Sequence, residues 1–267
     1  MISEKFLEGL VVYTGFLLEV VEKQPSAKAM GKICNEIASH FRALGISWIL
    51  LYSDINAFGQ GLTQSALTRK YFLKRCFDEE HLDLPARKSS FIDPFLDAIA
   101  VNQRPLAKEI ADLSPEEWWV DYEYEDDYAY AKFLYKIIDV EGADIAVLER
   151  IIEQFERAVE GNPSVRLSLC KALFFKDQDG FENAFHDLVS EFEDRNNEIG
   201  HPDSDSTLAQ NYTFEPNRWI FVEGLALLRI AAWLGLPTLE EFKFCPNILR
   251  IDNFGPFDSG SFPYIKL

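Results

Sequence analysis

The densest group of side chains capable of chemistry lies between Trp118 and Tyr130. This segment has the sequence WWVDYEYEDDYAY and mixes five carboxylates with four tyrosines and two tryptophans. Carboxylates can ligate a hard cation or attract a basic partner, and Tyr and Trp are residue types that anchor protein interfaces. The segment therefore supports three interpretations: part of a helical core, a metal site, or a partner-binding surface.

The core and metal interpretations make different demands on these residues. A core stripe at helical spacing would contain Tyr124, Tyr128, Ala131, Tyr135 and Ile138. Glu125, Lys132 and Lys136 would then face water. In the metal interpretation, Asp126, Asp127 and a neighbour would bind a cation through oxygen, but no partner motif such as Glu-x-x-His accompanies them.

In the binding interpretation, exposed acids and some aromatic side chains of this segment meet a basic partner protein. The candidate partner-binding residues are Asp121, Glu123, Glu125, Asp126, Asp127 and Tyr130. Replacing the five acids by Asn or Gln is expected to slow association with the partner while leaving the circular dichroism unchanged.

No other segment carries a recognisable catalytic motif. Gly59-Gln60-Gly61 begins like a dinucleotide-binding fingerprint, but the third glycine is missing. A phosphate-binding loop, a GxSxG elbow and an HExxH helix are all absent from the sequence, and the four histidines lie in separate segments. His186 is interpreted as a packing or surface residue. We therefore predict no catalytic, cofactor-binding or metal-binding residue and no cofactor.

Charge and composition narrow the function classes further. The 26 Lys and Arg against 44 Asp and Glu give a net charge of −18, which disfavours nucleic-acid binding because phosphates must be neutralised by cations. No apolar stretch reaches the roughly 20 residues of a membrane span, and the acidic N-terminus lacks the features of an export signal. The four cysteines are widely spaced, which indicates free thiols in the reducing cytoplasm.

Helical periodicity dominates the first half of the chain. The first helix carries Leu7, Leu10 and Leu18 inward, and Pro25-Ser26 then makes a break with a cap. A second stripe runs from Met30 and stops at Gly45. The following residues, 46–58, are either a buried helix or a strand. A helix follows over about 63–77, and Asp93-Pro94 opens a short one.

The second half has the pattern of helical hairpins joined by short turns. Ser114-Pro115-Glu116-Glu117 predicts a helix start, with helical pattern to about Asp139. Further helices are expected over 144–160, over 165–173, from Phe181 to about Asn197 and from Asn217 to Leu234. A turn is expected over 177–180, a polar loop over 200–216 and an irregular tail from Asp252. The predicted fold class is all-α: a bundle of antiparallel helical hairpins, repeat-like in the C-terminal half. One domain over 1–267 is expected, the alternative being a division into 1–110 and 111–267.

Two charged residues interrupt the apolar helix that begins at Asn217. Glu223 and Arg229 are six positions apart and so cannot pair on one helix face. Because burying either charge alone would be costly, each is expected to meet an opposite charge or reach the surface.

Several of these runs resemble the immunity protein 49 family. The resemblance is carried by Val222-Glu-Gly-Leu-Ala-Leu-Leu-Arg229, by Arg166 to Leu173, by Asp177-Gln-Asp-Gly-Phe181 and by Cys245-Pro-Asn-Ile-Leu-Arg-Ile-Asp252. It covers about residues 115–252, and the first hundred residues agree only in being helical. Within the shared Glu223-Gly224, Gly224 is expected to let a neighbouring helix approach closely.

The resemblance implies a bacterial cytoplasmic immunity protein that binds and neutralises a cognate secreted toxin of a polymorphic toxin system and is not an enzyme. It assigns no contact residues. We hypothesise that the acidic surface occludes a basic cleft of the toxin, such as that of a nuclease. Two alternatives from other classes stay open: a helical enzyme that uses clustered carboxylates with a metal, and a helical-repeat adaptor.

Overall fold

The computed structural model of the chain describes residues 2–23, 25–81, 84–139, 142–200, 212–238 and 240–255. Within these ranges the regular structure is helical, and the only β feature is an isolated bridge between Phe242 and Cys245. The N-terminal helices are α1 (Glu4–Glu22), α2 (Ala27–Tyr52), α3 (Ile55–Asp78), η1 (Pro85–Arg87), α4 (Asp93–Ala100) and α5 (Arg104–Leu113). They are followed by α6 (Glu125–Ile137), α7 (Ile145–Ala158), α8 (Val165–Phe175), α9 (Gln178–Ile199), α10 (Phe214–Asn217), α11 (Val222–Trp233) and η3 (Asn247–Leu249). The all-α prediction is confirmed for the described residues.

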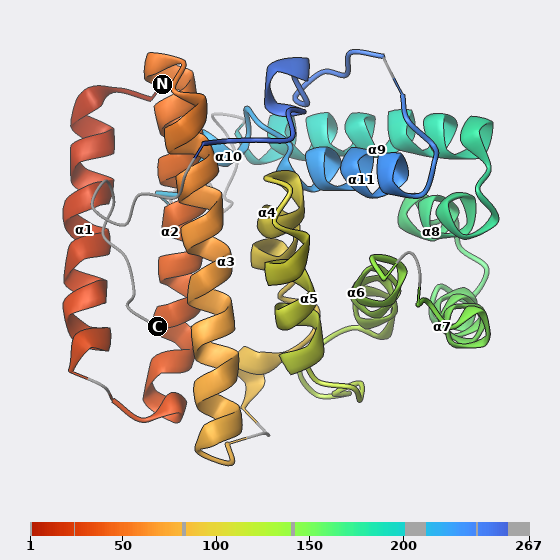
Figure 1. Cartoon of the computed structure of the whole chain (residues 1–267), viewed down its shortest axis with the longest axis horizontal. Coiled ribbons are helices and arrows are strands. Elements are labelled where there is room, and N and C mark those ends of the chain that lie inside the picture. Colours follow the sequence, from red (N-terminus) through yellow and green to blue (C-terminus); the bar gives the residue numbers. More distant parts are fainter. Residues whose placement is uncertain are drawn as a thin grey trace.

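The three longest N-terminal helices, α1 to α3, lie side by side at one end of the molecule (Figure 1). The axes of α2 and α3 approach closely at two glycines, because a Cβ atom on Gly61 would lie 2.6 Å from the Cα atom of Gly45. The predicted helix end at Gly45 is therefore wrong, and so is the strand alternative for 46–58. Gly45 lies inside α2, where its missing side chain makes room for α3.

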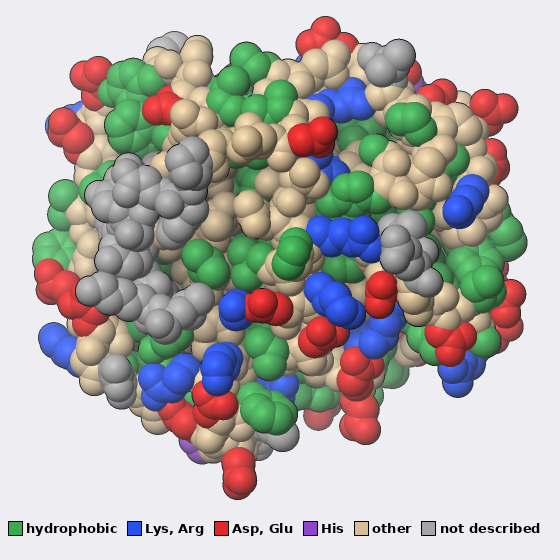
Figure 2. Space-filling model, in the orientation of Figure 1, with side chains coloured by type: hydrophobic (Ala, Val, Ile, Leu, Met, Phe, Trp, Pro, Cys, Tyr) green, Lys and Arg blue, Asp and Glu red, His purple; other side chains and the backbone are tan. Residues whose placement is uncertain are grey.

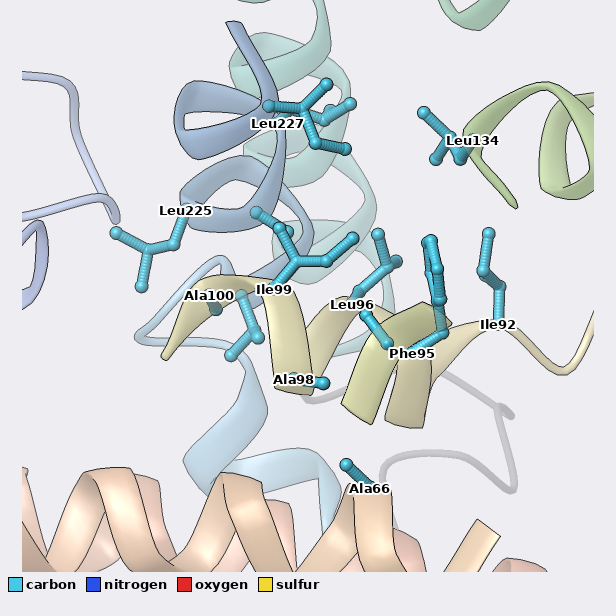
Figure 3. Close-up of a cluster of buried hydrophobic side chains, with 14 of the residues drawn as sticks. Ala66, Ile92, Phe95, Leu96, Ala98, Ile99, Ala100, Leu134, Leu225 and Leu227 are labelled. Carbon is cyan, nitrogen blue, oxygen red and sulfur yellow. The ribbon is translucent and has the colours of Figure 1, made fainter. Parts of the chain in front are cut away.

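The short helix α4 occupies the centre of the core. Its apolar side chains extend in several directions, toward Ala66 of α3 and toward Leu225 and Leu227 of α11 (Figure 3). Phe95 and Ile99 have no exposed surface, and the Phe95 ring meets the Tyr135 ring edge-on at 4.7 Å. The Asp93-Pro94 prediction is confirmed, since Pro94 stands in the first turn of this helix.

The C-terminal half is built from two helical hairpins, α6 with α7 and α8 with α9, and from α11, which packs against α4 (Figure 1). One continuous cluster of buried apolar residues joins this half to the N-terminal helices. All four cysteines are free and buried within it. Burial raises the pKa of the Cys34 thiol to about 12 and that of Cys76 to about 11.

Three further predicted helix boundaries differ from those in the structure. Ser114 ends α5 rather than starting a helix, because it precedes Pro115 and adopts the extended conformation that a following proline favours. The helix predicted from Phe181 begins at Gln178 instead, because the carboxylate of Asp177 caps it by accepting from Gly180 N–H. The helix predicted from Asn217 begins at Val222, after the separate turn α10.

Two further expectations concern Gly224 and Arg229, which lie within α11. The groups that approach Gly224 are Phe221, whose Cδ1 atom would lie 2.5 Å from a Cβ there, and Cys245, whose Sγ atom would lie 2.6 Å from it, rather than a neighbouring helix. Arg229 meets Asp252 at 2.8 Å, as expected of a charge on an apolar helix. Most of the loop predicted over 200–216 and the tail beyond residue 255 lie outside the described residues.

Candidate functional site

The acidic and aromatic segment forms a non-helical connection between α5 and α6. We call residues 114–124 the acidic-aromatic loop. Three of its large apolar or aromatic side chains extend into solvent: Val120 is 70% exposed, Tyr122 52% and Tyr124 79%. Asp121 lies among them and is also exposed. This loop places apolar, aromatic and acidic groups together on the surface.

Two partly buried hydrogen bonds hold the loop in its shape. The carboxylate of Glu123 accepts from the backbone N–H of Ser90 at 2.7 Å, and the Trp118 indole donates to the Glu123 carbonyl at 2.9 Å. Glu123 is only 8% exposed. Its carboxylate is therefore a structural group, and its assignment as a partner-binding residue is not supported by its position.

A lysine pair anchors the other end of the loop. Lys132 and Lys136 bind the two carboxylate oxygens of Glu116 at 2.7 and 3.2 Å. Burial raises the pKa of Glu116, but the hydrogen bonds and charges of the two lysines outweigh it, so this pKa lies below its usual value. Lys132 is buried and Tyr124 is exposed, so the predicted helical stripe is wrong at both positions. The stripe assumed that the helix starts at Ser114, whereas α6 starts at Glu125.

The remaining acids of the segment lie in the first turn of α6. Glu125, Asp126 and Asp127 are all partly exposed there. The Glu125 carboxylate accepts from the Gln154 amide at 3.0 Å, and Asp127 pairs with Arg166 at 3.3 Å. Carboxylates at this end of a helix are stabilised by the unpaired backbone N–H groups and the helix dipole.

Arg166 and Glu223 form the polar centre beside this turn. The guanidinium Nη2 lies 3.1 Å from Glu223 Oε2, and the Tyr130 hydroxyl donates to Glu223 Oε1 at 2.8 Å. The Arg166 guanidinium also lies over the Tyr130 ring, 4.7 Å from its centroid. Burial and the nearby Glu223 charge raise the Tyr130 pKa well above its usual value. Tyr130 is 1% exposed, so this predicted partner-binding residue belongs to the interior.

A groove opens above this polar centre. It has a volume of about 490 Å³, and three helices begin at its edge: α6, α8 and α11. It is lined by Asp126, Ala158, Val159, Asn162, Pro163, Ser164, Val165, Arg166, Leu188, Glu191, Phe192, Arg195, Phe221 and Glu223. Of the residues predicted from the sequence to bind a partner, Asp126 lines this groove, whereas its lining residues Arg166, Glu191 and Arg195 were not among those candidates. The spacing of Leu188, Glu191, Phe192 and Arg195 puts them on one face of α9, but periodicity cannot tell a groove wall from a solvated face.

Metal-ligating side chains do not gather elsewhere in the described part of the chain. No three His, Cys, Asp or Glu residues there are placed to hold a metal ion. His186 lies on the surface beside Glu240, with Nε2 and Oε2 3.2 Å apart. No helix among the described residues is long and apolar enough to cross a membrane.

Comparison with known proteins places the chain in a family. The family model described as immunity protein 49 matches residues 61–249, and the chain therefore belongs to the immunity protein 49 family. No curated protein and no solved structure matches it. The matched region contains the acidic-aromatic loop, the groove and the ion pair between Arg166 and Glu223, which joins segments 57 residues apart.

Proposed function

We propose that this protein binds a cognate toxin in the cytoplasm and neutralises it by binding alone, without catalysing a reaction. Membership of the immunity protein 49 family supports a role in immunity and implies a protein partner. The observation that carries the binding site is the exposure of Val120, Tyr122 and Tyr124 on a loop that partly buried hydrogen bonds hold in place.

The chemistry of the acidic-aromatic loop fits a basic partner. Tyrosine side chains bury large areas at interfaces with little loss of conformational freedom, and they commonly carry much of the binding energy. Asp121 in the loop and Glu125 next to it add negative charge, which would speed encounter with a cationic surface and fix its orientation. A toxin with a basic substrate cleft, such as a nuclease, would present that surface.

The distribution of charge on the surface favours a local binding site over attraction by a uniformly negative surface. On the face shown in Figure 2, Lys and Arg side chains alternate with Asp and Glu. The net charge of −18 attracts a cationic protein at long range. Because the charges are mixed on the surface, the place of contact depends on where acidic and aromatic side chains occur together. The loop is such a place.

Co-expression tests the proposal. The C-terminal domain of the protein encoded by the adjacent gene should kill cells when expressed alone and should be tolerated when this protein is present. Tyr122→Ala/Tyr124→Ala should abolish protection, and Asp121→Asn should slow association measured with purified proteins at low salt. The circular dichroism of these variants should not change, because the three side chains are exposed.

Phe77→Ala/Phe175→Ala provides the matched control. These two rings are 64% and 69% exposed and belong to α3 and α8 rather than to the loop, so their removal should leave protection intact. Full protection by the tyrosine variant would exclude the loop as the contact surface. If cells survive expression of the domain encoded by the adjacent gene without this protein, that domain is not a toxin that this protein neutralises.

A further inference from the structure

We propose that the groove beside Arg166 receives a lysine or arginine side chain of the partner polypeptide, together with an apolar neighbour. The proposal rests on the proposed function, because the partner is the toxin, and it adds a second contact to the acidic-aromatic loop. The groove volume of about 490 Å³ is within the range of about 300–1,000 Å³ typical of sites that enclose a ligand.

The walls suit a long basic side chain with an aliphatic stem. Leu188 and Phe192 of α9 form one wall, and Val165 and Phe221 line the groove at the starts of α8 and α11. Lysine and arginine bury their methylene groups along such apolar surface while the charged end seeks a polar partner. Leucine or another apolar side chain next to the basic residue would cover the rest of the surface.

Two carboxylates of the groove are available to that charged end. Asp126 and Glu191 have no hydrogen-bond or ion-pair partner among the described residues, and they come from α6 and α9. Arg166, by contrast, is already bound by Asp127 and Glu223. The groove lining as a whole has three carboxylates against two guanidinium groups, which favours a cation.

An anion fits this groove less well, although helix N-termini often bind anions. Two of the three helices that begin at the groove, α6 and α11, already carry carboxylates in their first turns, Asp126 and Asp127 on the one and Glu223 on the other, and the Ser164 hydroxyl caps the third, α8. These acids meet the positive ends of the helices, and they would repel a phosphate or an acidic peptide. Only Arg195 offers a guanidinium that lacks a partner within the described residues.

NMR with short peptides tests the groove without the toxin. Acetyl-Leu-Arg-Leu-amide added to the ¹⁵N-labelled full chain should shift the backbone amides of Arg166, Phe192 and Glu223. Acetyl-Leu-Glu-Leu-amide and inorganic phosphate should not. Asp126→Asn/Glu191→Gln should weaken binding of the arginine peptide roughly fivefold. The control Glu19→Gln/Glu22→Gln removes the same charge from exposed positions on α1 and should leave binding unchanged.

Three results would overturn the groove proposal: equal shifts with the glutamate peptide or phosphate, shifts scattered over the surface, or unchanged affinity in the Asp126→Asn/Glu191→Gln variant. The co-expression test separates this failure from failure of the proposed function. Protection with no peptide binding at the groove would retain the immunity role and exclude the groove. Peptide binding at the groove without any protection would retain the groove as a site for basic peptides. It would exclude the toxin encoded by the adjacent gene as the protein that supplies the basic side chain.

Discussion

The carboxylate of Glu79 accepts a hydrogen bond from the backbone N–H of Ala27 at 2.9 Å, so the end of α3 caps the start of α2. The sequence Pro25-Ser26 predicts that Ser26 provides this cap, but the Ser26 side chain makes no capping hydrogen bond. Glu79 is itself held by Arg75, whose Nε lies 2.8 Å from Glu79 Oε1. A residue 52 positions away therefore takes the role that local sequence suggested for a neighbour.

Removal of the negative charge from this cap should destabilise the fold in a pH-dependent way. The hydrogen bond from Ala27 and then Arg75 lower the pKa of Glu79 below its usual 4.5. Its contribution to the free energy of unfolding is therefore present above pH 4.5 and is lost as the pH falls through the lower pKa of the folded protein. Glu79→Gln should lose about 1 kcal/mol at pH 7 in urea unfolding, and this difference should shrink below pH 4.5. The exposed neighbour Glu80, changed to Gln, is the control, and an equal loss there would contradict the assignment.

Arg69 should be among the most sensitive positions in the core. Its side chain is 1% exposed, and its guanidinium donates to the carbonyls of Ala86, Arg87 and Lys88 at 2.6, 2.9 and 3.0 Å. Arg69→Met would leave these acceptors without a donor, at a cost of about 3 kcal/mol or more in urea unfolding. Arg69→Lys keeps the charge but loses the planar fork, so it should recover only part of the loss. Wild-type stability in either variant would show that water replaces the guanidinium.

Glu123 and Asp121 should differ although they are two positions apart. Glu123→Ala leaves the partly buried Ser90 N–H without its acceptor and should cost about 1–3 kcal/mol, whereas exposed Asp121→Ala should stay within about 0.5 kcal/mol. Thermal unfolding followed by circular dichroism measures both. In the variant in which all five acids become amides, Glu123→Gln keeps an acceptor oxygen for the Ser90 N–H, so its loss of stability should be smaller than that of Glu123→Ala. Equal stability of the two alanine variants would contradict the structural role of Glu123.

The hydroxyl of Tyr130 and the carboxylate of Glu223 should be energetically coupled. Tyr130→Phe and Glu223→Gln each weaken their contact at 2.8 Å, so a double-mutant cycle measured by urea unfolding should give a coupling of about 1 kcal/mol. Additive losses would mean that the hydroxyl gains nothing from this carboxylate. The charge of Glu223 should matter beyond this pair, because Arg166 also binds it.

Much of the fold could be predicted from the sequence because amphipathic helices repeat their apolar residues at a fixed spacing. Leu7, Leu10 and Leu18 are buried on α1 as their spacing predicts. The helix start predicted at Ser114-Pro115 was wrong because this pair is compatible both with the start of a helix and with the end of the preceding one. In the structure Ser114 ends α5, and the Trp118 indole then donates to the Glu123 carbonyl within the non-helical loop that follows. The single-domain organisation stays a prediction.

The candidate site was harder to predict because exposure depends on tertiary contacts. Asp121 and Glu123 are both acids in one polar run, yet only a contact with the distant Ser90 distinguishes them. Asp126 lines the groove that the sequence could not reveal, because its other walls come from α7, α8, α9 and α11. Glu223 was expected to find an opposite charge, and Arg166 is that charge, but sequence spacing alone could not name it.

The burial of all four cysteines makes the native protein convenient for site-directed labelling. Thiol reagents attack the thiolate, and buried thiols with raised pKa values present almost none of it. An Asp121→Cys variant would therefore carry one reactive sulfur, placed on the acidic-aromatic loop. A maleimide dye attached there would report arrival of the partner as a change in fluorescence, with no need to remove the native cysteines.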